Sequence, residues 1–326
     1  MTNRNKKREP ARGFRETRPA AREPTPEEPR RRGVLDALFA ARPPADIGMP
    51  RIRTALARGV AVVAGSPVLV VAPFLYVLAL WLVMVAFGFQ GPFAPFANAL
   101  ALPPMGTSFD ATLATGLFGL QGGLLAILAF VALRSVVMAF LTTAIVDSLE
   151  AGRTSIWAVT RGVVALPTTL GVNIIGIGLL TLSSFFAPLL GPGFGILIQL
   201  ATLVLGAYLF VYAPVIAVAE RGTMPEALSK SVRAARIPGA GNLTMASLYV
   251  IPTVAVILAP GKPGNIIGVN PSIGAWVFVL LATFLQVVAM AAFAYRYLSI
   301  ADEVPAAAPR QAPARGRGRP PARRGR

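Results

Sequence analysis

The sequence predicts an all-α membrane protein with six transmembrane helices, arranged as three helical hairpins with amphipathic helices on the cytoplasmic side. Hydrophobic residues make up 55 % of the chain, and no charged residue occurs from Gly59 to Phe109. Such a run is too long for a soluble core, because one transmembrane helix needs about 20 apolar residues. The formal net charge is nevertheless +17, and most of the charges lie in the two tails. Short motifs also recur at the ends of the apolar runs.

Three apolar runs end with the same spacing between an aromatic and an acidic residue. The matching residues are Phe140, Glu150 and Gly152 in the first copy, Phe210, Tyr212, Glu220 and Gly222 in the second, and Phe293, Tyr295 and Glu303 in the third. Two helix entrances also match, since Arg58-Gly59-Val60 and Arg161-Gly162-Val163 both lead into apolar sequence. We interpret these copies as three related hairpins.

The chain divides into a membrane domain at 51–300 and two polar tails. Residues 1–50 and 301–326 are rich in Arg and Pro, and we expect both to be disordered and cytoplasmic. The first tail is too long and too charged for a cleavable signal peptide. A basic helical lead-in at 51–58 is expected at the membrane surface.

The apolar runs give the positions of the six predicted spans, and the loops give their orientation. The spans are expected at 62–88, within 112–146, and at 166–187, 194–219, 241–260 and 273–298. The loop from Gln90 to Asp110 has no Lys or Arg, whereas the opposite ends of the spans are basic. Because short loops rich in Lys and Arg remain in the cytoplasm, both termini should be cytoplasmic.

The chain contains neither Cys nor His. This composition excludes disulfides, zinc sites with Cys or His ligands, and nucleophiles that depend on a Cys–His or Ser–His pair. The glycines follow no strand and form no phosphate-binding loop. We therefore predict no enzyme, no cofactor and no metal.

The segment from Met224 to Arg236 is predicted to be a short amphipathic helix. Thr223 and Glu226 form a capping box at its start, and Glu226 should pair with Lys230 one turn later. Lys230, Arg233 and Arg236 form a basic stripe. The helix either contacts a cytoplasmic protein or anionic lipid headgroups, or only turns the chain around at the membrane surface.

A counterpart of this helix is expected at about 155–164. Trp157 and Arg161 suit the headgroup level of a membrane and are candidate lipid contacts. The C-terminal tail contains Arg317-Gly318-Arg319-Pro320, which is similar to the core of a minor-groove DNA-binding motif. A disordered tail attracted to anionic membranes explains these arginines better, so nucleic acid is not an expected partner.

Arg134 is the charged residue that could lie deepest in the membrane. A span at 126–146 would place it near mid-bilayer, at a cost of at least about 3 kcal/mol without a partner, whereas a span at 113–133 would place it at the interface. The other candidate intramembrane polar residues are Asn173, Gln199, Tyr212 and Gln286, which could line a cavity or join helices by hydrogen bonds. No Asp or Glu is expected within a span, which argues against an ion-coupled transporter.

The pattern around the amphipathic helix resembles a known group of proteins. Tyr212-x-Pro214, the turn Glu220-Arg221-Gly222 and the motif Glu226-Ala227-Leu228-x-x-Ser231 are similar to the polytopic membrane domain fused to some glycerophosphoryl diester phosphodiesterases, and to related prokaryotic integral membrane proteins. The resemblance covers about 55–300 and implies a prokaryotic plasma membrane. In the fused enzymes a separate soluble domain performs catalysis, so the resemblance implies no catalytic residue here.

Two functional hypotheses follow. The first is a non-enzymatic membrane scaffold that couples to a cytoplasmic protein through its amphipathic helices. The alternative is a transport or lipid-handling protein with an intramembrane cavity near Arg134. An importer permease fits less well, because the Glu226-Ala227-Leu228 loop has Val232 where that family has Gly. The oligomeric state and the substrate are not predicted.

Overall fold

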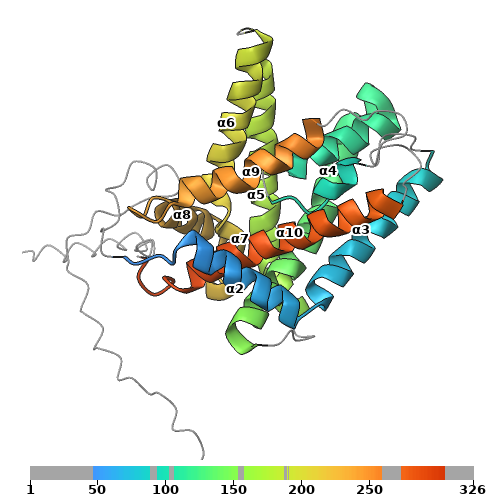
Figure 1. The fold of residues 1–326 in the computed structure, drawn as a ribbon. Coiled ribbons are helices and arrows are strands. Elements are labelled where there is room, and N and C mark those ends of the chain that lie inside the picture. The colour runs from blue at the N-terminus through green and yellow to red at the C-terminus, as the bar shows by residue number, and fades with distance from the viewer. Residues whose placement is uncertain are drawn as a thin grey trace, which may run out of the picture. The chain divides into compact units, whose positions relative to one another are not determined.

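The computed structural model describes residues 47–88, 94–102, 106–152, 158–186, 189, 191–258 and 273–304. These residues are mostly helical and include no strand, which confirms the all-α fold class (Figure 1). The predicted disordered tails lie almost entirely outside the described residues, as does Trp157. Ile47, within the predicted tail, is buried against the helical domain.

The helices identify a multi-pass membrane protein. Among the described residues, five stretches are long and apolar enough to cross a membrane, namely Val68–Ala86, Gly123–Ala151, Thr160–Phe186, Gly193–Glu220 and Ile273–Leu298. The span predicted at 241–260 is α9, Asn242–Leu258, which has 17 residues. At 1.5 Å per residue it is about 25 Å long, somewhat short of the hydrocarbon thickness of about 30 Å.

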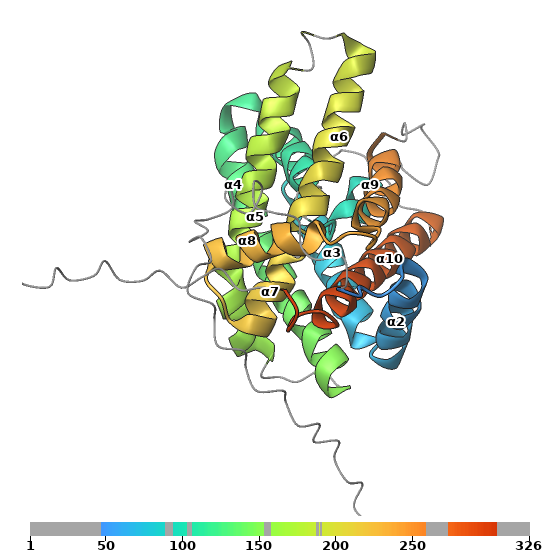
Figure 2. The same ribbon diagram turned by 90° about the vertical axis from the view of Figure 1, so that its left-hand side faces the viewer.

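The first predicted span is two helices and not one. α2 covers Ile52–Gly65 and α3 covers Val68–Ala86, with a break at Pro67, which cannot donate a backbone hydrogen bond. α2 lies beside α10, Ile273–Leu298, in both views (Figures 1 and 2). The two helices approach closely because α2 presents Gly59, where a Cβ atom would lie 2.7 Å from the carbonyl oxygen of Val288.

α4, Gly106–Ala151, contains a chain reversal at Gly119. This residue has φ 65° and ψ −171°, a conformation open to glycine. Asp110 and Arg134 are 2.8 Å apart, although 24 residues of straight helix would separate them by about 36 Å. The part of α4 before Gly119 therefore folds back against the part after it.

Within the loop predicted between the first two spans, the described residues 96–102 are buried. The 3₁₀ helix η1, Ala94–Asn98, leads into an irregular stretch up to Leu102. From Phe96 to Leu102 the residues are all buried, against α4, α9 and α10. We call 94–102 the re-entrant segment, because irregular backbone at membrane depth is stable only when protein surrounds it.

The middle of the chain forms a long hairpin followed by a buried helix. α5, Ala158–Phe186, and α6, Pro192–Phe210, lie side by side in both views (Figures 1 and 2). α5 is continuous, so the separate helix predicted at 155–164 is wrong. The predicted span at 194–219 lies within the candidate span Gly193–Glu220, in which a turn at Val211 and Tyr212 precedes α7, Ala213–Glu220. α8 is Met224–Ala235, and its residues from Ala227 onward are all buried.

Candidate functional site

A buried ion pair lies at the centre of the bundle. The Nε and Nη2 atoms of Arg134 lie 2.9 and 2.8 Å from Oδ2 of Asp110, and the two residues are 0 % and 1 % exposed. By the helical rise, Arg134 is about 22 Å along α4 from Gly119 and about 25 Å from Ala151. Of the two registers left open by the sequence, the one at 113–133 would include the reversal at Gly119, whereas the candidate span Gly123–Ala151 includes Arg134.

Asp110 places a buried carboxylate beside Arg134, whereas the sequence predicted no Asp or Glu within a span. The sequence places Asp110 at the end of a surface loop, but the reversal at Gly119 brings it to Arg134. Asn173 of α5 completes the group, since its Oδ1 accepts a hydrogen bond from Arg134 at 3.1 Å and its Nδ2 donates to Ser135 at 2.7 Å. We call Asp110, Arg134 and Asn173 the polar centre.

The polar centre also holds the re-entrant segment in place. Arg134 donates to the carbonyl oxygen of Ala101 at 3.3 Å, and Gln286 of α10 donates to that of Ala97 at 2.8 Å. The backbone N–H of Leu102 donates to the Tyr249 hydroxyl of α9 at 2.6 Å. These side chains supply the partners that irregular backbone would otherwise lack in a membrane.

The remaining polar candidates join helices. Gln199 of α6 donates to the Ser184 hydroxyl of α5 at 3.2 Å. Tyr212 donates to Asn242 of α9 at 2.7 Å and is fully buried. Both contacts are of the interhelical kind that the sequence analysis gave as one of its alternatives.

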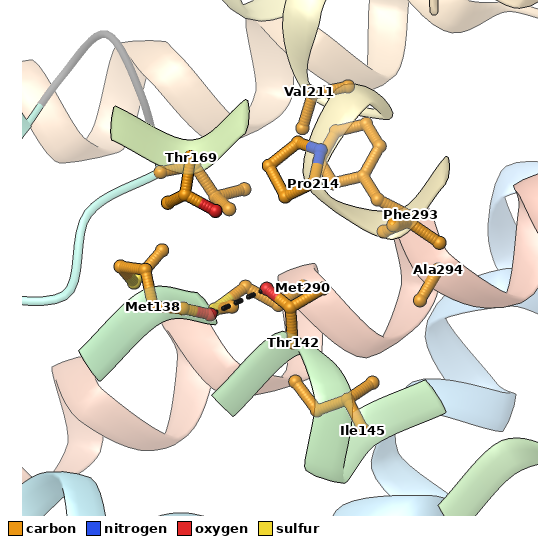
Figure 3. Close-up of a pocket in the computed structure, with 11 residues that line it drawn as sticks. Met138, Thr142, Ile145, Thr169, Val211, Pro214, Met290, Phe293 and Ala294 are labelled. Carbon is orange, nitrogen blue, oxygen red and sulfur yellow. Dashed lines mark hydrogen bonds between the residues drawn. The ribbon is translucent and has the colours of Figure 1, made fainter. Parts of the chain in front are cut away.

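A small cavity lies one helical turn from the polar centre. Figure 3 shows Met138 and Thr142 of α4 facing Thr169, Pro214 and residues of α10 across this space. Its volume, counted for the centre of a water-sized sphere, is about 10 Å³, which is room for about one water molecule. The Thr142 and Thr169 hydroxyls donate to carbonyls of their own helices, so their oxygen lone pairs remain as acceptors.

A second, half-buried cluster joins the ends of α7 and α10 to the middle of α8. Lys230 Nζ lies 2.6 and 2.7 Å from the two carboxylate oxygens of Glu220, and the Tyr297 hydroxyl donates to the same carboxylate. The predicted pair of Lys230 with Glu226 is therefore wrong, because Lys230 turns inward from α8. We call Glu220, Lys230 and Tyr297 the inner cluster.

Glu226 instead caps α8, as the sequence predicts. Its carboxylate accepts a hydrogen bond from the Thr223 backbone N–H at 2.9 Å, and this bond lowers the pKa of Glu226 below its usual value. The predicted basic stripe is not exposed on the surface of the protein, because Lys230 and Arg233 are only 8 % and 5 % exposed. Arg236 follows α8 and is half-buried.

Arg161 does not stand alone at the surface either. Its Nη1 lies 2.7 Å from Oδ1 of Asp147 near the end of α4. This bond ties the start of α5 to α4, much as Lys230 ties α8 to α7 through Glu220. The two contacts occupy similar places in the first and second sequence copies.

Asp110, Glu220 and Tyr297 were not predicted from the sequence as members of polar clusters. Asp110 could have been selected, because it is the first charged residue after 51 uncharged ones and Arg134 is the next. Glu220 and Tyr297 could not have been selected in this way, since their contact depends on how α7 and α10 pack.

The chain was compared with known proteins in three ways. No protein-family model matches it, and neither the curated proteins nor the solved structures give a significant match. The resemblance to the membrane domain of the phosphodiesterases therefore stays a prediction.

Proposed function

We propose that this chain is a non-enzymatic membrane transport protein whose substrate path passes the polar centre. The observation that supports the proposal best is the Asp110–Arg134 pair, which is buried within the apolar helices. Ionised side chains inside a membrane are costly, and those that occur usually belong to solute or ion paths. The main argument against a transporter was the absence of a deep carboxylate, and Asp110 removes it.

The breaks in the helices around the cavity support the same proposal. Transporters commonly bind their substrates where membrane helices are discontinuous. Here α4 reverses at Gly119, α6 gives way to α7 at Tyr212, and the re-entrant segment contributes Leu102 to the cavity wall. Such breaks allow the parts of the bundle to move against one another.

In this arrangement the cavity is closed on both sides. The re-entrant segment covers the polar centre, and the inner cluster ties α7, α8 and α10 together beyond the cavity. A cavity for about one water molecule admits no larger solute. Transport thus requires an opening movement that breaks the contacts of one of these two groups.

The scaffold hypothesis has lost most of its support. It assigned partner contacts to Lys230 and Arg233, which are buried within the chain. Among the described charged residues of that helix and its end, Glu226 and Arg236 retain part of their surface. We therefore rank partner coupling below transport.

We place the protein in a prokaryotic plasma membrane with both termini in the cytoplasm. The distribution of Lys and Arg among the loops supports this orientation. It requires that the short helix α9 also crosses the membrane, for which its 17 residues are at the lower limit.

Cysteine accessibility tests the transport path without knowledge of the substrate. The natural chain has no Cys, so Thr142→Cys and Thr169→Cys each introduce a single thiol into the cavity wall. We expect a charged, membrane-impermeant methanethiosulfonate reagent to modify both positions from one side of a vesicle. Leu205→Cys is the control, since its side chain is exposed on the apolar outer face of α6 and should not react.

Inert cavity positions would overturn the proposal. If Thr142→Cys and Thr169→Cys resist the reagent from both sides while Arg53→Cys on α2 reacts, the cavity does not open to water. The polar centre would then have only the structural role of holding the re-entrant segment.

A further inference from the structure

α2 presents a basic surface that the ion pairs of the protein leave unused. Arg51, Arg53 and Arg58 are all exposed. Within the described part of the chain, the salt bridges involve Arg134, Arg161 and Lys230 and none of these three arginines. Their charge therefore faces the surroundings of the protein.

The helices around this surface contain no acidic residue, and Asp302 and Glu303 lie exposed just after α10. α2, α9 and α10 contain no Asp or Glu within their bounds. Arg296 of α10 is fully buried close to the start of α2, and it bonds only to neutral groups, the carbonyl of Ala240 and the sulfur of Met245. This corner of the bundle thus has an excess of positive charge.

The same helix also exposes apolar side chains. Ala55, Gly59 and Val63 face inward, whereas Leu56 and Val60 are 39 % and 44 % exposed. At 100° per residue Arg53 lies about 20° from Val60 and about 60° from Leu56, whereas Arg51 and Arg58 share the opposite flank of α2. A helix that exposes a basic side chain beside apolar ones is typical of the surface of a bilayer.

We propose that α2 binds the headgroup of an anionic phospholipid. The arginines contact the phosphate group, and Leu56 and Val60 lie against the upper part of the acyl chains. A lipid fits better than a soluble polyanion for two reasons. The apolar flank needs an apolar partner, and α2 leads directly through Ser66 and Pro67 into the membrane helix α3. The inference does not depend on the transport function.

Titration of the purified full-length chain with phosphatidylglycerol tests the proposal. The protein is kept in a neutral detergent, and bound lipid is counted by native mass spectrometry, with phosphatidylcholine as the uncharged comparison. Each Arg near an anionic surface contributes about 1 kcal/mol, which is a factor of about five in affinity. We expect Arg53→Gln and Arg58→Gln each to weaken phosphatidylglycerol binding about five-fold, and the double variant about 30-fold.

Arg221→Gln is the matched control, because Arg221 is exposed and also carries one charge, but it lies in the turn between α7 and α8. It should change the affinity less than two-fold. Equal loss in Arg221→Gln and Arg58→Gln would show an effect of net charge alone and overturn the proposal. Unchanged binding in the double variant, or equal binding of the two lipids, would do the same.

Discussion

Replacing Arg134 by Met should destabilise the protein severely. The substitution keeps an unbranched side chain in the space but removes every hydrogen bond of the guanidinium. Asp110 would keep a buried carboxylate without its partner, and the oxygens of Ala101 and Asn173 would lose a donor. Removal of one partner from a buried ion pair costs about 3–5 kcal/mol, which is a large part of the stability of an ordinary domain.

A second substitution distinguishes the lost pair from simple loss of packing. In the double variant Arg134→Met with Asp110→Leu, no charge remains buried, so the largest part of the cost should disappear. The carbonyl of Ala101 and the amide oxygen of Asn173 still lack a donor, at about 1–3 kcal/mol for such a buried group. The double variant should therefore be more stable than Arg134→Met alone.

The free energy of unfolding is measured by titrating the protein from mild detergent into dodecyl sulfate and following tryptophan fluorescence. Leu133→Met is the control, because this neighbour of Arg134 is 45 % exposed on the outer face of α4, and it should shift stability by less than about 0.5 kcal/mol. Two results would refute the reasoning. One is a cost below about 1 kcal/mol for Arg134→Met, and the other is a double variant no more stable than Arg134→Met alone.

Three other substitutions test separate parts of the structure. Gly59→Ala should lower the free energy of unfolding by about 1–3 kcal/mol in the same titration, because the new methyl group meets the backbone of α10. Gly171→Ala is its control, because there the methyl group meets only the flexible end of a methionine side chain, and the loss should be less than about 1 kcal/mol. Glu226 has a lowered pKa in the folded protein, so its stabilising effect is complete above its unfolded pKa and is lost as the pH falls through the folded value. Glu226→Gln should remove this contribution to the pH dependence of stability, which is measured as the difference in melting temperature between pH 7 and pH 3. If the difference is the same in Glu226→Gln and in the unchanged chain, the Glu226 carboxylate does not stabilise the start of α8. Lys230→Met should lower the free energy of unfolding by about 1.5–3 kcal/mol through loss of the bond to Glu220. A melting temperature equal to that of the unchanged chain would show that the inner cluster contributes nothing to stability.

The helical fold could be predicted because it depends on local composition. The last span was predicted at 273–298 and is α10 with the same bounds. The capping box of Thr223 and Glu226 was also predictable, because a cap involves neighbouring residues only. Breaks were harder to predict, since Pro67 stops a helix whereas Pro73 and Pro252 lie inside helices.

The candidate site was predicted only in part, because its contacts join distant residues. Arg134, Asn173 and Gln286 were selected for their polarity within apolar runs, which the sequence displays directly. The partners of these residues could not be predicted from the sequence. Asp110 reaches Arg134 only because the chain reverses at Gly119, and Ala97 lies 189 positions before Gln286. For the same reason Lys230 was assigned to Glu226 in its own helix and not to Glu220.

The contacts of the re-entrant segment also determine the order in which the protein can be assembled. Ribosomes deliver residues 94–102 before α9 and α10 exist, yet Tyr249 and Gln286 supply bonds to this segment from those helices. Until the last helix enters the membrane, the carbonyl of Ala97 lacks its amide donor, and such a group is unstable in hydrocarbon. The nascent segment must therefore stay in water or beside the insertion machinery until α10 has been inserted. If the chain is truncated before α10, its first half also lacks contacts that it needs to fold.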